Sequence, residues 1–274
     1  MFKNILKILL VISLVIFTLS AVAARDITLT GSTTVLPIAQ AAAEVYMKKN
    51  TRVKITVNGG GSSNGIKAII DGTADIGDAS RLAKDSEIQK AKDKGIDLYK
   101  NVVALDGIAV VAHKSCPVTS LTMEQTRDIF AGKITNWKEV GGPDMTIVVI
   151  SRDTSSGTYG SFVEMVLDYK EKNKMRADAQ MTASNQAMAT TVAQTPYSIG
   201  YLGLGFVKAA DVKVVKINNI EASDKTVKNG TYPISRTLNM YTDGKPKGEV
   251  KKFIDFILSK DGQKIVVEQG YIKL

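Results

Sequence analysis

Cysteine and histidine are scarce in this 274-residue chain, with one residue of each. The single cysteine, Cys116, excludes a disulfide framework, so the stability of the fold has to come from an apolar core of ordinary size. The sequence has no cluster of cysteine and histidine and no run of carboxylates at metal-ligand spacing, so we expect no metal site and no metal cofactor.

Aromatic residues are also few, at 6% of the chain, and the lysines are scattered. This composition argues against a nucleic-acid-binding surface, although the formal net charge is +9. Attraction of small anions, or a solvated basic face, explains the positive charge equally well. Gly60 and Gly65 have the spacing of a P-loop, but Ile66 stands where the lysine should be, which argues against nucleotide binding.

A long hydrophobic run occurs at the N-terminus, where Lys3 and Lys7 precede an apolar segment at residues 8–19 and Ala21-Val22-Ala23 follows it. The run is short for a membrane span, and this order is typical of a secretory signal peptide. We expect residues 1–23 to be removed, with cleavage after Ala23 or one residue later. No cysteine lies near this point, so we expect a soluble periplasmic protein without a lipid anchor and with a formal charge of +7.

Strands, polar turns and helices follow one another three times in the first part of the mature chain. The strand patterns lie near residues 27–30, 53–57 and 74–76, and the helical patterns lie near residues 36–46, 66–70 and 84–94. Such alternation indicates an α/β fold with mainly parallel sheets. In such sheets the polar turns gather at the carboxyl ends of the strands, where ligands bind.

Two extended segments, at residues 102–112 and 232–241, indicate crossings between two lobes. We expect lobe 1 to comprise residues 24–112 and 206–274, and an inserted lobe 2 to comprise residues 113–205. Two C-terminal helical patterns, at residues 247–259 and 261–269, should then return to lobe 1. The sequence thus predicts a monomeric, two-lobed clamp with a hinge.

Four polar turns stand at predicted strand ends and helix starts. They are Ser32-Thr33-Thr34, Ser62-Ser63, Ser80-Arg81, and Arg152 with Ser156-Gly157-Thr158. Free N–H groups and hydroxyls at a helix start can bind an anion, and a guanidinium matches two oxygens of a tetrahedral oxyanion at once. Each turn taken alone is equally well an ordinary helix cap. The occurrence of four such turns, from both predicted lobes, favours an oxyanion site.

A serine hydrolase is the alternative from another functional class. Gly61-Ser62-Ser63-Asn64-Gly65 fits the G-x-S-x-G pattern between a strand and a helix. Ser63, then Asp78 or Asp106, then His113 would follow the chain order of a hydrolase triad. His113 ends an apolar strand pattern, however, which favours a packed or surface histidine over a general base.

A set of motifs spans essentially the whole mature chain. They are residues 31–37 (GSTTVLP), 59–65 (GGGSSNG), 79–81 (ASR), 105–110 (LDGIAV), 134–137 (ITNW), Arg152 with 156–158 (SGT), and 199–203 (IGYLG). Together with the signal peptide, this set resembles the phosphate-binding proteins of phosphate ABC transporters. The resemblance implies a type II periplasmic-binding-protein fold, whose two lobes close on inorganic phosphate and present it to inner-membrane ABC permease subunits.

The resemblance also implies the residues that line the cleft: Ser32, Thr33 or Thr34, Ser62 or Ser63, Ser80, Arg81, Arg152, Ser156, Gly157 and Thr158. The chain departs from the family pattern at two positions. Ser80 stands where some members carry a carboxylate that accepts a hydrogen bond from protonated phosphate, and Tyr159 stands where many carry an arginine.

These departures leave the source of oxyanion selectivity open, with sulfate and molybdate as alternative ligands. Asp78 is our first candidate for a selectivity carboxylate, because its turn also carries Ser80 and Arg81. Asp153, beside Arg152, is the second candidate. An equally strong alternative is that Asp78 pairs with Arg81 or caps the following helix.

Overall fold

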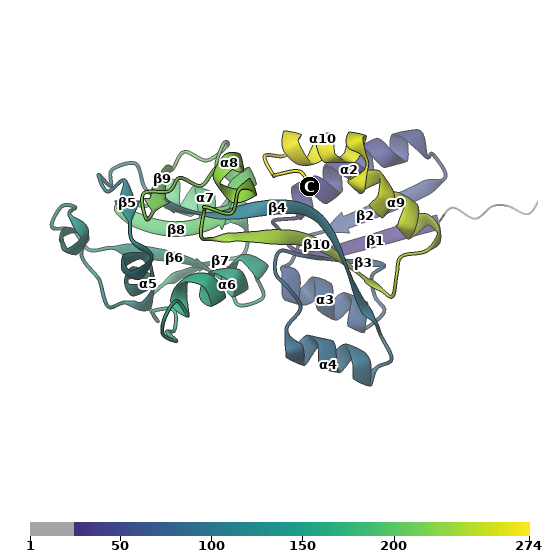
Figure 1. Cartoon of the computed structure of the whole chain (residues 1–274), viewed down its shortest axis with the longest axis horizontal. Coiled ribbons are helices and arrows are strands. Elements are labelled where there is room, and N and C mark those ends of the chain that lie inside the picture. The colour runs from purple at the N-terminus through teal and green to yellow at the C-terminus, as the bar shows by residue number, and fades with distance from the viewer. Residues whose placement is uncertain (1–24) are drawn as a thin grey trace, which may run out of the picture.

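The structure, a computed structural model, describes residues 25–274, and the predicted signal peptide lies outside the described residues. It consists of two α/β lobes joined by two long strands (Figure 1). Across both lobes the strands follow the order β2-β1-β3-β10-β4-β8-β6-β7. Within the described residues, no helix combines the length and apolarity needed to cross a membrane.

Lobe 1 is a sheet with helices on both faces. Its strands are β1 (Arg25–Gly31), β2 (Val53–Asn58), β3 (Ile76–Ala79) and parts of β4 (Leu98–Ala112) and β10 (Ser235–Asp243). One face carries α2 (Leu36–Lys49), α9 (Gly248–Leu258) and α10 (Lys260–Glu268), and the other carries α3 (Ser62–Ile70) and α4 (Asp85–Asp93) (Figure 1). The two C-terminal helices therefore return to lobe 1, as the sequence predicts.

Lobe 2 has a smaller sheet and shorter helices. Its strands are β5 (Ser120–Leu121), β6 (Val148–Arg152), β7 (Gln180–Thr182), β8 (Ser198–Gly203) and β9 (Lys213–Ile217). Its α-helices are α5 (Met123–Ala131), α6 (Gly157–Phe162), α7 (Asn185–Gln194) and α8 (Asp224–Lys228). Two short 3-10 helices, η1 (Trp137–Val140) and η3 (Leu204–Phe206), and one π-helical segment, η2 (Val163–Leu167), complete the lobe. Phe162 stacks on Tyr201 at 3.9 Å between ring centroids, which ties α6 to β8 in the core.

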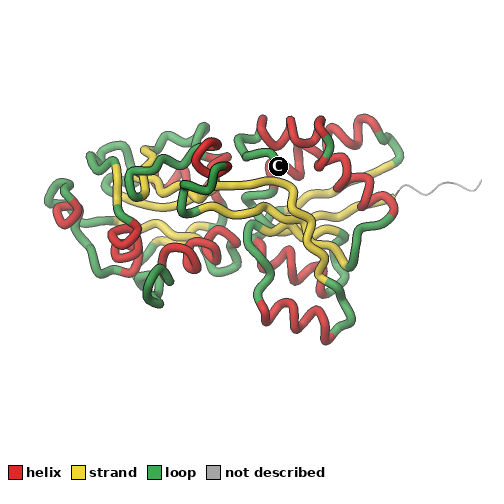
Figure 2. The backbone as a smooth tube through the Cα atoms, viewed as in Figure 1, coloured by secondary structure: helices red, strands yellow, loops and turns green. Residues whose placement is uncertain are grey.

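The two crossing segments are the strands β4 and β10, which run side by side between the lobes (Figure 2). The strand β4 is 15 residues long and pairs with β10 in lobe 1 and with β8 and β9 in lobe 2. Among the described strands, each pair that involves β4 or β10 is antiparallel, and the remaining pairs are parallel. The predicted α/β fold with two extended crossings is therefore confirmed, and the sheet is mixed, because both crossing strands run antiparallel to their neighbours.

The strand pairing and the cores of the two lobes indicate a boundary between the lobes that differs from the sequence-based one. The strand β9 pairs with the far end of β4, and Val215, Ile217 and Val227 lie in the core of lobe 2, although the sequence-based division assigned them to lobe 1. The apolar pattern shows where a strand lies and not which distant strand it pairs with. We propose that lobe 2 comprises residues 108–234, because Ile108 and Ile234 both belong to its core.

Candidate functional site

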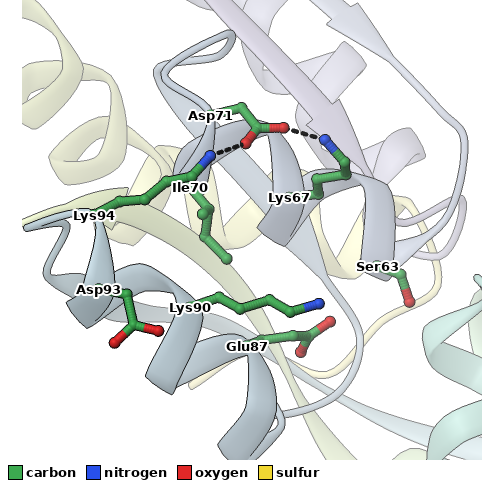
Figure 3. Close-up of a pocket in the computed structure, with 8 residues that line it drawn as sticks. All are labelled: Ser63, Lys67, Ile70, Asp71, Glu87, Lys90, Asp93 and Lys94. Atoms are coloured by element: carbon green, nitrogen blue, oxygen red, sulfur yellow. Dashed lines mark hydrogen bonds and ion pairs between the residues drawn. The ribbon is translucent and has the colours of Figure 1, made fainter.

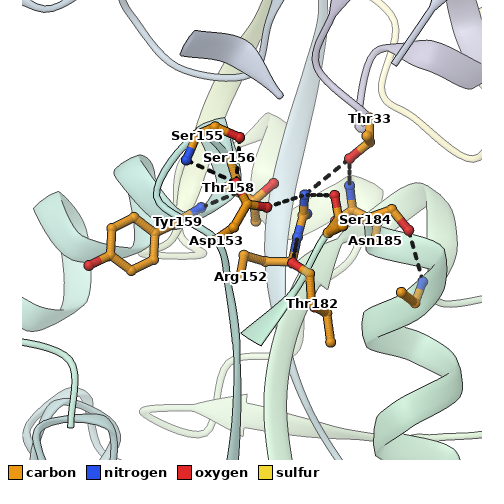
Figure 4. Close-up of polar contacts among 12 residues, drawn as sticks. Thr33, Arg152, Asp153, Ser155, Ser156, Thr158, Tyr159, Thr182, Ser184 and Asn185 are labelled. Carbon is orange, nitrogen blue, oxygen red and sulfur yellow. Dashed lines mark hydrogen bonds and ion pairs between the residues drawn. The ribbon is translucent and has the colours of Figure 1, made fainter. Parts of the chain in front are cut away.

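Polar turns of both lobes meet at one edge, where Thr33, after β1, lies beside Arg152 and Thr182, at the ends of β6 and β7 (Figure 4). The lobes touch there. The amide of Ser63 donates to the carbonyl oxygen of Ser155 at 3.0 Å, and Ser161 Oγ donates to the carbonyl oxygen of Ser80 at 3.2 Å. The turns that the sequence leads us to expect together therefore converge, and direct contacts join the two lobes at this edge, which we call the cleft.

Arg152 is the cation at this edge, and its side chain is 1% exposed. Its Nε donates to the carbonyl oxygen of Thr182 at 3.1 Å, and its Nη2 donates to that of Ala183 at 3.1 Å and to Thr33 Oγ1 at 3.2 Å (Figure 4). These partners are neutral, and the nearest carboxylate, Asp153, is 4.0 Å away. Burial lowers the pKa of Arg152. Its Nη1 is buried and has no partner among the described residues, so the guanidinium retains a free donor, and its charge is offset only by Asp153 at 4.0 Å.

Buried hydroxyl groups from both lobes lie at the same edge. Thr34 Oγ1, from lobe 1, lies 3.0 Å from Thr158 Oγ1 of lobe 2. Ser62 Oγ lies 3.4 Å from Ser80 Oγ and accepts from the Ser80 amide at 3.0 Å. Hydroxyls can donate to an anion without adding charge, so the set is suited to neutral hydrogen bonding around one fixed cation.

Ser32 and Ser156 lie at the same edge, and their hydroxyls accept hydrogen bonds from backbone amides. Ser32 Oγ accepts from the amide of Thr34 at 3.1 Å, and Ser156 Oγ accepts from the amide of Tyr159 at 3.3 Å. Both residues are 2% exposed. The capping alternative is therefore correct for Ser156, the N-cap of α6. Ser32 precedes Val35, the N-cap of α2, and bonds within the turn before that helix.

Gly157 brings the two lobes into their closest approach. A Cβ atom at this position would lie 2.1 Å from Ser62 Oγ and 2.5 Å from Ser80 Oγ, both across the cleft. Real Cβ contacts are never this short, so a larger residue would hold the lobes apart.

Asp78 is fully buried at the end of β3, and neither of its carboxyl oxygens has a partner among the described residues. Burial raises its pKa well above the ordinary value. It neither pairs with Arg81 nor caps a helix, so the alternative considered from the sequence is wrong. Asp153, by contrast, has a side chain 37% exposed and accepts from the amide of Ser155 at 2.9 Å.

Ser63 and Arg81 lie together on the side of the cleft that leads to α4. Arg81 forms a two-pronged ion pair with Glu87, with both N–O distances at 2.7 Å, and its Nη2 also donates to Ser63 Oγ at 2.9 Å. Glu87 and Ser63 line a cavity of about 430 Å³ between α3 and α4, together with Lys67, Ile70, Asp71, Lys90, Asp93 and Lys94 (Figure 3). Of the two arginines predicted for the site, Arg81 is therefore paired, whereas Arg152 has an unpaired donor at the cleft.

Sequence reasoning missed three buried residues at this edge. Asn185 Nδ2 donates to Thr34 Oγ1 at 2.9 Å and to Thr33 Oγ1 at 3.3 Å. Asn185 starts a helix after a strand, so it shows the same turn pattern as the other sites and could have been found. Arg236 and Asp106 come from the crossing strands, where no turn marks them, and they form an ion pair at 2.8 Å.

The hydrolase geometry is absent from the described structure. His113 Nδ1 bonds to Ser115 Oγ at 2.8 Å, and the His113 amide donates to the carbonyl oxygen of Ser198. Ser198 pairs with Val148, four residues before Arg152 on β6, so His113 lies about 13 Å along the sheet from the cleft. Ser63, at the cleft, has Arg81 as its side-chain partner instead.

Comparison with known proteins connects this geometry to a family. The PBP superfamily domain matches residues 18–261. The phosphate-binding protein PstS of Bacillus subtilis is 35% identical over 251 residues, which cover 91% of this chain and 81% of that protein. PstS of Borreliella burgdorferi is also 35% identical, over 90% of each chain.

This chain is also similar to solved structures of phosphate-transport proteins. A candidate phosphate ABC transporter substrate-binding protein from Clostridium perfringens, solved with bound phosphate, has a TM-score of 0.83 at 38% identity and covers 91% of this chain and 100% of that one. An ABC-type phosphate transport receptor from Vibrio cholerae has a TM-score of 0.75 at 34% identity, with coverages of 90% and 100%. The chain therefore belongs to the PBP superfamily and, within it, to the PstS family of phosphate-binding proteins.

Proposed function

We propose that this protein binds inorganic phosphate between its two lobes and delivers it, as a periplasmic monomer without catalytic activity, to the permease subunits of an ABC-type phosphate importer. Its relatives named PstS are phosphate-binding proteins, and the similar protein from Clostridium perfringens was solved with bound phosphate. The N-terminal pattern of residues 1–23 supports export.

The observation that carries this proposal is the free Nη1 of Arg152. A buried guanidinium with an unpaired donor and only neutral partners is costly unless an anion completes it. Its Nη2 already donates to Thr33 Oγ1 of lobe 1. Asn185 links Thr33 to Thr34, whose hydroxyl lies 3.0 Å from Thr158 Oγ1 of lobe 2. An oxyanion held there contacts both lobes at once, which couples its binding to closure of the clamp.

Calorimetric titration of the phosphate-stripped protein with phosphate, sulfate and molybdate tests the proposal directly. We expect phosphate to bind most tightly and small-angle scattering to show a smaller radius of gyration in its presence. Tighter binding of sulfate or molybdate would assign the cleft to that oxyanion instead, and the absence of heat with all three would refute an oxyanion site.

Replacing Arg152 with alanine should weaken phosphate binding by about 30-fold or more, because it removes a buried, charge-assisted contact. Calorimetry measures the loss, and thermal unfolding shows whether the variant is folded. Arg176→Ala is a matched control, since Arg176 pairs with Asp178 near the opposite end of β7. Equal affinities of a folded Arg152→Ala variant and of the control would show that Arg152 does not contact the ligand.

Gly157→Ala should weaken phosphate binding by about tenfold or more, because the added methyl group would collide with Ser62 and Ser80 across the cleft. The melting temperature of the ligand-free protein should not fall, since the φ angle of Gly157 is not positive and alanine favours a helix start over glycine. Gly59→Ala is the control, because its Cβ would meet Thr33 and Leu36 at ordinary distances of 3.4 and 3.5 Å. Unchanged phosphate affinity in Gly157→Ala would mean that binding does not need this contact between the lobes.

Asp78→Asn should lose the preference for phosphate over sulfate much more than it loses phosphate affinity. Phosphate near neutral pH still carries a proton that a carboxylate can accept, whereas fully ionised sulfate offers none and is repelled by the buried charge. Competition between the two anions at constant pH measures this ratio. A variant that rejects sulfate as strongly as the wild type would exclude Asp78 as the selectivity group and leave Asp153 or the neutral donors.

The raised pKa of Asp78 gives this variant a second readout. The folded state holds the Asp78 proton more tightly than the unfolded state, so this carboxyl lowers stability as pH rises above the ordinary aspartate range. Asp78→Asn removes that penalty. The ligand-free variant should therefore unfold at a higher temperature than the wild type at neutral pH, and the difference should vanish below about pH 4.

The absence of catalysis predicts that His113→Ala keeps the phosphate affinity of the wild type, because His113 lies far from the cleft. The wild type should also show no turnover of activated esters. Ester hydrolysis that disappears in both Ser63→Ala and His113→Ala would instead establish the hydrolase.

A further inference from the structure

Arg236 places a second guanidinium beneath the cleft, on one of the two crossing strands. It stands opposite Asp106 in the register of β10 and β4, and its side chain is 3% exposed. Its Nε and Nη2 both donate to Asp106 Oδ2, at 3.0 and 2.8 Å. Asp106 Oδ1 in turn accepts from the amide of Leu204 in lobe 2 at 3.0 Å.

The same guanidinium reaches residues of both lobes. Its Nη2 lies 3.4 Å from Thr34 Oγ1 of lobe 1 and 3.1 Å from Thr158 Oγ1 of lobe 2. These two hydroxyls bond to each other across the closed cleft. Arg236 therefore lies at the point where the lobes and the crossing strands meet.

One end of this guanidinium is left free. Because Nε and Nη2 both face Asp106, Nη1 is the end of the planar fork turned away from that carboxylate. It is buried and has no partner among the described residues. A buried guanidinium nitrogen without an acceptor is costly, so such an atom indicates a group that completes it.

Arg152 and Arg236 lie close enough for their charges to interact. The pKa of Arg152 is lowered first by burial and in part by the positive charge of Arg236. Asp106 lies 2.8 Å from Arg236, whereas Asp153 lies 4.0 Å from Arg152. Of the two cations, Arg152 thus supplies most of the net charge at the cleft, and Arg236 supplies a free N–H donor, Nη1, from the crossing strands.

We propose that Arg236 contacts the bound anion directly through Nη1, so that the cleft holds its tetrahedral oxyanion between two guanidinium groups, one from lobe 2 and one from the crossing strands. This inference rests on the proposed function and adds a residue to its site. Because β4 and β10 form the connection between the lobes, a contact at Arg236 would also tie the ligand to the part of the molecule that bends on closure.

The competing explanation is that Arg236 serves only as the structural partner of Asp106. Two variants separate these roles, because Arg236→Gln and Asp106→Asn break the same ion pair. If Arg236 contacts the anion, Arg236→Gln loses at least about tenfold in phosphate affinity relative to Asp106→Asn. Asp106→Asn loses less affinity, because it leaves the charge and the donors of Arg236 at the site.

Calorimetric titration of the wild type and both variants with inorganic phosphate makes the measurement, with thermal unfolding to confirm that each variant is folded. Similar losses in the two variants would overturn the inference, as would wild-type affinity in Arg236→Gln. If Arg236→Gln does not fold, Arg236→Lys replaces it, because a single ammonium cannot hold both Asp106 and the anion. It should also bind at least about tenfold more weakly than Asp106→Asn, and equal affinities would refute the proposal.

The wild-type titration keeps this test separate from the proposed function. A wild type that does not bind phosphate contradicts the function itself. A wild type that binds phosphate, with variants that lose affinity equally, contradicts only the role of Arg236.

Discussion

The site depends on one constraint, which is that the buried guanidinium of Arg152 is held by neutral groups. Carbonyl oxygens of Thr182 and Ala183 and the hydroxyl of Thr33 fix its plane without cancelling its charge. A carboxylate in contact would have made the burial cheaper and removed the attraction for an anion. An unpaired buried polar group costs ~1–3 kcal/mol, which the protein tolerates here because binding an anion can recover it.

The contacts of Arg152 also hold the two lobes together. The partners of Arg152 come from both lobes, since Thr182 and Ala183 belong to lobe 2 and Thr33 belongs to lobe 1. Only glycine at position 157 lets the hydroxyls of Ser62 and Ser80 approach from the opposite side. Excluding water from this space strengthens each remaining electrostatic contact.

The crossing strands connect the lobes and also carry polar side chains that reach the site. Asp106 and Arg236 stand opposite each other in β4 and β10, and their ion pair reaches the hydroxyls that the two lobes present to one another. The strands that connect the lobes thus also contact the hydroxyls at which the lobes meet. Arg81 shows the contrasting case, because its pairing with Glu87 removes it from the set of free cations at the cleft.

The sequence by itself determined the alternation of strands and helices, the two crossings, the return of the C-terminal helices to lobe 1, and the turns that carry Thr33, Thr34, Ser62, Ser80, Arg152 and Thr158. These features are local, since apolar periodicity and turn chemistry are properties of neighbouring residues. The tertiary structure alone decided which partner each polar group found. In the folded protein Arg81 pairs with Glu87, and Asp78 has no partner among the described residues. Asn185 and Arg236 lie at the cleft, and β9 pairs with β4. Such pairings join residues far apart in the chain, so only the packing of the whole fold determines them.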